Sequence, residues 1–203
     1  MENNNLAVAS PIQLNGPGTM IDSSFCRAAV FNTKNVEMVT DLAFGKPKNY
    51  YKVVSVPAAS WMLSKKIIET IGGFDPLFFH YGEDSNYCQR LKYHNETIAI
   101  VPNAYIYHDR FEKGNTALFN KIDILRMLFL EYADINHKPF IINKNTFKLH
   151  LHIIANLLKG LITFNGQLIC NTWWTINQFY THLGVIKRSR RNNVTKQSNW
   201  LAI

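Results

Sequence analysis

An adjacent pair of carboxylates, Glu83 and Asp84, is the feature of the sequence with the clearest chemical potential. It follows an aromatic-rich approach, Phe78 to Tyr81, and precedes a segment with helical character. Two interpretations are open. The carboxylates can cap the helix, because acidic side chains there satisfy free backbone N–H groups and complement the helix dipole. Alternatively, the aromatic side chains form a partly dry wall for a sugar, in which a carboxylate can act as a general base.

His108 is the second candidate, at the end of a segment whose alternation places Ala104, Ile106 and His108 on one face. A lone histidine on a strand can be purely structural. A neutral imidazole is also a good ligand for a divalent ion that carries a nucleotide diphosphate, which makes His108 a candidate metal ligand. Asp109 beside it can orient the imidazole ring or simply be solvated.

Three further features surround the first predicted helix, Lys65 to Ile71. Trp61 lies just before this helix, where it can pack in the core or line a site. Gly72 and Gly73 follow the helix, where they can end it or allow the backbone to approach a ligand closely. Arg90 belongs to the next helix and is either a solvated charge or a partner of the carboxylate pair.

The elements that must position these residues change in character along the chain. Strands are predicted over Leu6–Ile12, Val53–Val56, Ala59–Leu63 and Ile98–Val101, and helices over Lys65–Ile71 and Ser85–His94. Residues 13–50 are ambiguous, with turn residues at both ends. Beyond Gly114, apolar residues recur at helical spacing, which predicts a mainly helical second part. Polar residues interrupt its longest apolar stretch, so no membrane span is predicted.

Composition indicates a globular protein, with 47% hydrophobic and 18% charged residues among 203. Three cysteines without a Cys-x-x-Cys spacing indicate neither a disulfide framework nor a zinc knuckle. No signal peptide is visible, so a reducing, cytosolic setting is expected. The net charge of +8 is uneven: residues 1–109 hold 9 Lys/Arg against 10 Asp/Glu, and residues 110–203 hold 13 against 4. Such asymmetry suggests nucleic acid or an anionic membrane surface as a partner.

The order of motifs resembles the acceptor-side half of the family-two glycosyltransferases, which have the GT-A fold. The matching segments are Ala59–Lys66 (ASWMLSKK), Gly72–Asp75 (GGFD), Phe78-Phe79, Glu83-Asp84, Arg90, Val101–Ala104 (VPNA) and His108. The resemblance runs from residue 59 to residue 108, and both the order and the spacing match. It implies an α/β fold, a partial GT-A-like mixed sheet followed by a C-terminal helical extension.

The resemblance also implies a role for each candidate residue. Asp84 would be the catalytic base and Glu83 would shape the acceptor site. His108 would be a ligand of a divalent metal, Mn²⁺ or Mg²⁺, whose tight binding we expect to need a further half of the enzyme. The donor would be a nucleotide sugar, and the acceptor a saccharide or a lipid-linked molecule. The remaining substrate-binding residues would be Trp61, Gly73, Phe74, Asp75, Tyr81 and Arg90.

One departure from the family pattern limits these expectations. Family members carry an Asp-x-Asp motif that holds the metal and the donor diphosphate, and no Asp-x-Asp occurs in these 203 residues. We therefore expect residues 1–114 to be a partial GT-A domain, residues 115–186 a helical extension, and residues 187–203 a basic tail. A separate N-terminal half chain is the candidate partner for donor binding.

Two questions stay open at this level. The C-terminal helices can rest on an anionic membrane or simply pack on the first domain. The chain can be a glycosyltransferase, or a non-catalytic module that binds glycan, membrane or a partner chain. A nucleic-acid partner is not expected, because no recognised motif supports it. The expected location is cytoplasmic, with peripheral attachment to the inner face of the membrane as an alternative.

Overall fold

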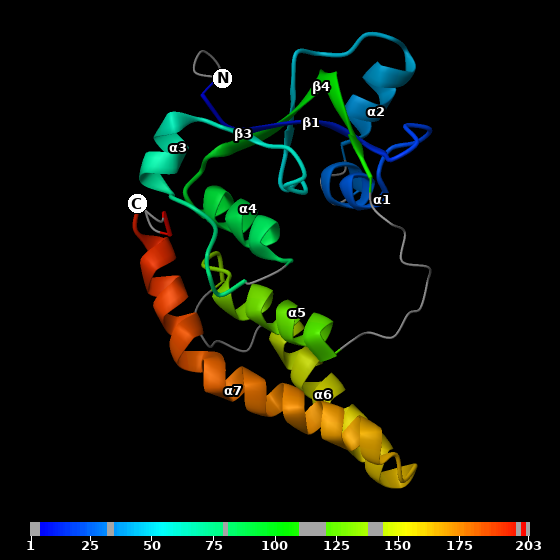
Figure 1. Cartoon of the computed structure of the whole chain (residues 1–203), viewed down its shortest axis with the longest axis vertical. Coiled ribbons are helices and arrows are strands. Elements are labelled where there is room, and N and C mark those ends of the chain that lie inside the picture. Colours follow the sequence, from blue (N-terminus) through cyan, green and yellow to red (C-terminus); the bar gives the residue numbers. More distant parts are fainter. Residues whose placement is uncertain are drawn as a thin grey trace.

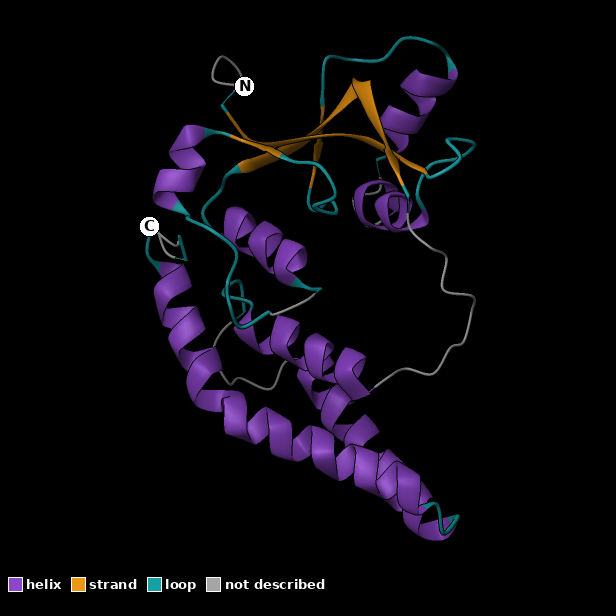
Figure 2. Cartoon of the chain, in the orientation of Figure 1, coloured by secondary structure: helices purple, strands orange, loops and turns teal. Residues whose placement is uncertain are grey.

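The structure, a computed structural model, describes residues 5–31, 35–78, 81–109, 121–137, 144–197 and 200–201. It is an α/β arrangement in which a four-stranded mixed sheet lies above a series of helices (Figures 1 and 2). The strands are β1 (Leu6–Asn15), β2 (Tyr51–Val53), β3 (Met62–Leu63) and β4 (Thr97–His108), in the spatial order β2-β4-β1-β3. The central strands β1 and β4 run parallel, and the outer strands β2 and β3 are antiparallel to their neighbours.

The central pair is longer than predicted because it continues past two prolines. β1 was expected to end near Ile12, after Pro11, but it extends to Asn15, which lies opposite His108. Where β1 steps from Pro11 to Ile12, β4 advances from Val101 to Tyr105, so the ladder shifts register at that point. Proline has no N–H to donate, and a bulge lets both strands resume their pairing.

Five helical segments accompany the sheet in the first part of the chain. They are α1 (Ser23–Phe25), η2 (Cys26–Phe31), α2 (Val36–Ala43), α3 (Lys65–Thr70) and α4 (Glu83–Tyr93). The first three resolve the region that the sequence left ambiguous. Ser64 caps α3 by accepting a hydrogen bond from the Ile67 N–H at 3.4 Å, which confirms the predicted start of that helix.

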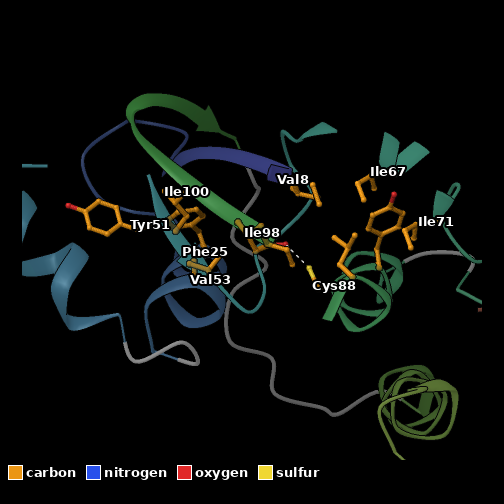
Figure 3. Packing of buried hydrophobic residues seen from close by; sticks show 14 of the residues in the cluster. Val8, Phe25, Tyr51, Val53, Ile67, Ile71, Cys88, Ile98 and Ile100 are labelled. Atoms are coloured by element: carbon orange, nitrogen blue, oxygen red, sulfur yellow. Dashed lines mark hydrogen bonds between the residues drawn. The ribbon is translucent and has the colours of Figure 1, made fainter. Parts of the chain in front are cut away.

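The main core lies between the sheet and the helices beneath it (Figure 3). Val8 and Ile100 of the central strands, Phe25 of α1 and Leu91 of α4 are all buried in this one cluster. Cys88 also belongs to it, and its Sγ donates to the carbonyl oxygen of Val56 at 3.9 Å. Burial raises the pKa of the Cys88 thiol to about 12, so this thiol stays protonated at neutral pH.

Three long helices form the second part: α5 (Lys121–Ala133), α6 (Lys144–Ile162) and α7 (Gly166–Val194). The prediction of a mainly helical C-terminal part is confirmed, although its boundary at residue 114 lies outside the described residues. Residues 187–194, expected to begin a tail, are the last turns of α7. No helix in the described ranges is both long and apolar enough to cross a membrane.

A second apolar cluster joins the three-helix part to the first part. Its buried members come from the segment before α4, from α5 and from α7: Leu77, Phe78, Leu128, Phe129, Ala133, Phe179 and Ile186. Leu77 and Phe78, which precede the carboxylate pair, therefore pack against α5 and α7.

Candidate functional site

The first turn of α4 holds the carboxylate pair, and a left-handed turn leads into it. Tyr81 has a φ of 65° and Gly82 a φ of 100°, so the chain reverses sharply before Glu83. A Cβ added to Gly82 would lie 3.1 Å from Cγ of Arg126 and 3.1 Å from Cδ1 of Phe78. The position thus needs glycine for its backbone angle and for the close packing of α5.

The two carboxylates differ in their hydrogen bonds. Each has one oxygen that accepts no hydrogen bond from the described residues. Oδ1 of Asp84 accepts hydrogen bonds from the N–H of Ser85 at 2.6 Å and from Oγ of Ser85 at 3.3 Å. Oδ2 of Asp84 makes no hydrogen bond within the described residues. Oε2 of Glu83 is buried and has no hydrogen-bond partner there either. A buried oxygen without a donor is costly, so this site suits a ligand hydroxyl or a water molecule.

Three aromatic rings pack together, and one of them comes from α4. The ring centroids of Trp61, Phe74 and Tyr87 lie 5.5–6.0 Å apart, in tilted and edge-to-face arrangements. Tyr87 follows Glu83 by one helical turn and therefore shares its face of α4. Nε1 of Trp61 is a buried donor without a partner in the described part of the chain. Tyr87, the member of this cluster on α4, is buried, and its hydroxyl donates to the carbonyl oxygen of Gly72 at 3.0 Å.

Arg90 takes neither of the two roles that the sequence left open. It is buried and donates hydrogen bonds to the carbonyl oxygens of Ile71 and of Gly73, the latter at 2.6 Å. Its guanidinium also lies 5.1 Å from the ring centroid of Tyr87. Desolvation lowers the pKa of Arg90, and the guanidinium is held by carbonyl dipoles at the end of α3.

The Gly-Gly-Phe-Asp turn faces the C-terminal end of the chain. Oδ2 of Asp75 accepts hydrogen bonds from Oγ of Ser189 at 2.5 Å and from Nδ2 of Asn193 at 2.8 Å. A Cβ added to Gly73 would lie 2.4 Å from the carbonyl oxygen of Trp200. These contacts supply Gly73, Asp75 and Arg90 with structural roles, and their substrate-binding roles stay predictions.

His108 pairs with Asp22, which precedes α1 and is distant from His108 in the sequence. Its Nδ1 lies 3.8 Å from Oδ2 of Asp22. Asp22 is buried, and its Oδ1 accepts hydrogen bonds from the N–H groups of Ser24 and Phe25 at 2.9 Å, which caps α1. The 3.8 Å distance to His108 is within the range of an ion pair but is longer than a hydrogen bond.

This pair falls short of a complete metal site. Across the residues that the structure describes, no three His, Cys, Asp or Glu side chains are arranged to hold a metal ion. Mn²⁺ and Mg²⁺ prefer several oxygen ligands, which one imidazole and one carboxylate do not supply. The predicted metal would therefore need ligands in addition to this pair.

The carboxylate pair and the His108 region lie on the same side of the sheet. α1, which Asp22 caps, and α4 both lie beneath the strands (Figures 1 and 3). Gln13 of β1 contacts the loop between β2 and β3, since its Nε2 donates to the carbonyl oxygen of Pro57 at 2.8 Å. The preceding residue, Val56, accepts from Cys88, one helical turn beyond Asp84.

Sequence reasoning missed Gln13, Asp22, Tyr87 and Arg126. The Arg126 guanidinium lies 5.0 Å from the ring centroid of Tyr81, and Nη1 donates to Oδ1 of Asp123 at 2.9 Å. A cation thus stands beside Tyr81, two residues before Glu83. The sequence shows only an arginine among apolar residues of a helix, which is no signal of this position. Phe79, part of the predicted aromatic approach, lies outside the described residues.

Comparison with known protein families, curated proteins and solved structures finds no match for this chain. What the structure establishes is the class: an α/β protein with a four-stranded mixed sheet and C-terminal helices.

Replacing Gly82 with alanine is expected to lower the free energy of unfolding by about 2–3 kcal/mol. About 1–2 kcal/mol comes from the left-handed backbone, and the rest from contact with Phe78 and Arg126. Urea denaturation measures the change. Gly45→Ala is the matched control, because Gly45 has a φ of 66° with no atom within 4 Å of an added Cβ. Equal losses of unfolding free energy at the two positions would show that Phe78 and Arg126 move aside for the added methyl group at little cost.

Proposed function

We propose that this chain forms the acceptor side of a glycosyltransferase with a GT-A fold, in which Asp84 is the general base. The observation that carries the proposal is the first turn of α4. There a carboxylate with one oxygen that no described residue bonds lies one turn from Tyr87, whose ring packs with those of Trp61 and Phe74. The order of motifs from Ala59 to His108, which resembles the family-two glycosyltransferases, supports it.

The proposed reaction is a transfer with inversion at the anomeric carbon. The acceptor hydroxyl oxygen attacks this carbon and forms the new glycosidic bond, while the bond to the donor diphosphate breaks. The diphosphate leaves with the bonding electron pair, and the hydroxyl proton passes to Oδ2 of Asp84. Glu83, whose Oε2 lacks a donor in the described part of the chain, would accept a hydrogen bond from another acceptor hydroxyl.

Trp61, Phe74 and Tyr81 would hold the acceptor sugar. The apolar face of a sugar ring packs against aromatic rings, while its hydroxyls reach the polar atoms at the edge. Nε1 of Trp61 offers one donor of this kind. Arg126, beside Tyr81, would attract an acceptor that carries a phosphate.

Saccharide binding by the 203-residue chain tests this acceptor site. Saturation-transfer NMR with a panel of mono- and disaccharides is expected to detect binding that Tyr81→Ala weakens about fivefold, equivalent to about 1 kcal/mol. Tyr180→Ala is the matched control, since both tyrosines are exposed and Tyr180 lies on α7. Binding that is absent, or that both variants weaken equally, would refute the acceptor site.

The same chain is expected to bind nucleotide sugars poorly, because it contains no Asp-x-Asp motif. Calorimetry with Mn²⁺ and uridine, guanosine and thymidine diphosphate sugars should show dissociation constants of about 1 mM or weaker. Micromolar binding to any of them would reveal a donor site within these residues.

A non-catalytic glycan-binding module is the second candidate function. The absence of an Asp-x-Asp motif favours it, as does the lack of a three-ligand metal group among the described residues. A donor-binding chain supplied in trans separates the two candidates: it should produce transfer only if the acceptor-side proposal is right.

A further inference from the structure

Helix α6 exposes an apolar stripe to solvent. Its members recur at helical spacing and are 48–77% exposed: Leu151, Ile154, Leu158, Leu161 and Ile162. At about 100° per residue they fall within an arc of about 100°, which is the width of one helix face. This stripe is distinct from the face that packs on α7, where Gly160 is buried and an added Cβ would lie 2.6 Å from Cγ1 of Ile169.

The turn between α6 and α7 adds an aromatic residue to this surface. Phe164 is 94% exposed and has a φ of 51°, a left-handed conformation that glycine or asparagine usually occupies. Asn165, the next residue, caps α7 by accepting from the N–H of Leu168 at 3.0 Å. Turn geometry alone does not call for phenylalanine, and its side chain extends at the end of the hairpin farthest from the sheet (Figure 1).

The charge of this region has one sign. Residues 135–203 contain no Asp or Glu and nine Lys or Arg: Lys138, Lys144, Lys148, Lys159, Lys187, Arg188, Arg190, Arg191 and Lys196. On α7, Trp173, Tyr180, Lys187 and Arg191 are exposed and recur at intervals that place them on one face. An amphipathic aromatic ring and a cation suit the interface between lipid tails and headgroups.

We propose that the α6–α7 hairpin docks on a membrane surface rich in anionic lipids. The stripe and Phe164 would enter the boundary between headgroups and acyl chains, and the cations would contact lipid phosphates. Nucleic acid would leave the apolar stripe in water. A second copy of the chain would bring two cationic surfaces together, which is unfavourable. Membrane docking does not depend on the proposed transfer reaction, although it would bring the site close to a lipid-linked acceptor.

Vesicle flotation of the 203-residue chain tests the proposal. Vesicles of phosphatidylcholine mixed with phosphatidylglycerol in equal parts are expected to bind at least ~10-fold more protein than vesicles of phosphatidylcholine alone. Raised salt should reduce the binding. Replacing both Leu161 and Phe164 with serine should lower the affinity at least ~10-fold, whereas Phe44→Ser, at a site 75% exposed after α2, should not.

A second variant keeps the test independent of the hairpin's own folding. Replacing Lys159 and Arg191 with glutamine should remove most of the preference for phosphatidylglycerol while circular dichroism stays unchanged. Several results would overturn the proposal: no binding to either vesicle, equal loss in the Phe44→Ser control, or tighter retention on DNA than on vesicles. Sedimentation velocity that shows a dimer lost in the Leu161/Phe164 variant would assign the stripe to self-association instead.

Discussion

Replacing Asp84 with asparagine is expected to reduce glycosyl transfer by about 10²–10⁴-fold, the usual contribution of a general base. Asparagine has nearly the same shape but cannot accept the proton of the attacking hydroxyl. Its Oδ1 can still accept the hydrogen bond from the Ser85 N–H, now seen at 2.6 Å, so the helix start should persist. The assay supplies the chain with a donor-binding partner and measures transfer of labelled sugar.

Two controls separate this catalytic effect from a structural one. Glu69→Gln removes an exposed carboxylate that pairs with Lys65 at 3.7 Å, and it should leave transfer unchanged. Urea denaturation of Asp84→Asn should show a change below about 1 kcal/mol, because only a partly exposed contact is altered. Normal turnover in Asp84→Asn would return this residue to the role of helix cap.

Replacing Asp75 with alanine is expected to lower the free energy of unfolding by about 3–5 kcal/mol. Asp75 is buried and accepts three hydrogen bonds, from Leu77, Ser189 and Asn193. Each hydrogen bond to a charged group contributes about 1.5–3 kcal/mol, and the variant also leaves buried donors without acceptors. Chemical denaturation measures the loss, and hydrogen exchange should show it concentrated in the last turns of α7.

Asp75→Asn is the matched variant for this prediction. Its Oδ1 can still accept from the Leu77 N–H, but its amide would face the Nδ2 donor of Asn193. The loss should therefore be intermediate, about 1–3 kcal/mol. A double-mutant cycle between Asp75 and Ser189 should show coupling well above 0.5 kcal/mol. A loss below about 1 kcal/mol in Asp75→Ala would contradict the anchoring role.

Features that depend on neighbouring residues were predictable from the sequence. The start of α3 at Ser64 and the helical character of the second part follow from local patterns. The helix that follows the carboxylate pair was also predicted, although it begins at Glu83 rather than at Ser85. Capping and side-chain periodicity act within one or two turns, so the printed residues are enough to predict them. The position of the candidate base Asp84 belongs to this group, whereas the packing of Trp61 and Phe74 on Tyr87 needs contacts between distant segments.

The partners of the candidate residues depend on contacts between distant parts of the chain. Asp75 bonds Ser189, 114 residues away, and Asp22 approaches His108 from another element. Arg90 was open to two surface roles and instead lies buried against carbonyl oxygens. Such pairs form only when the sheet and helices pack, and no local pattern encodes which carbonyl or carboxylate a buried donor will meet.

The strands, too, were predictable from the sequence only in part. Alternating residues predicted the strand that ends at His108, but the parallel pairing of β1 with β4, and the shared register shift at their prolines, needed the assembled sheet. A strand's partner is set by burial of both of its faces, which its own residues do not specify. The sequence alone therefore determined which side chains could do chemistry here, and the tertiary packing decided which of them became structural anchors and which stayed near the surface.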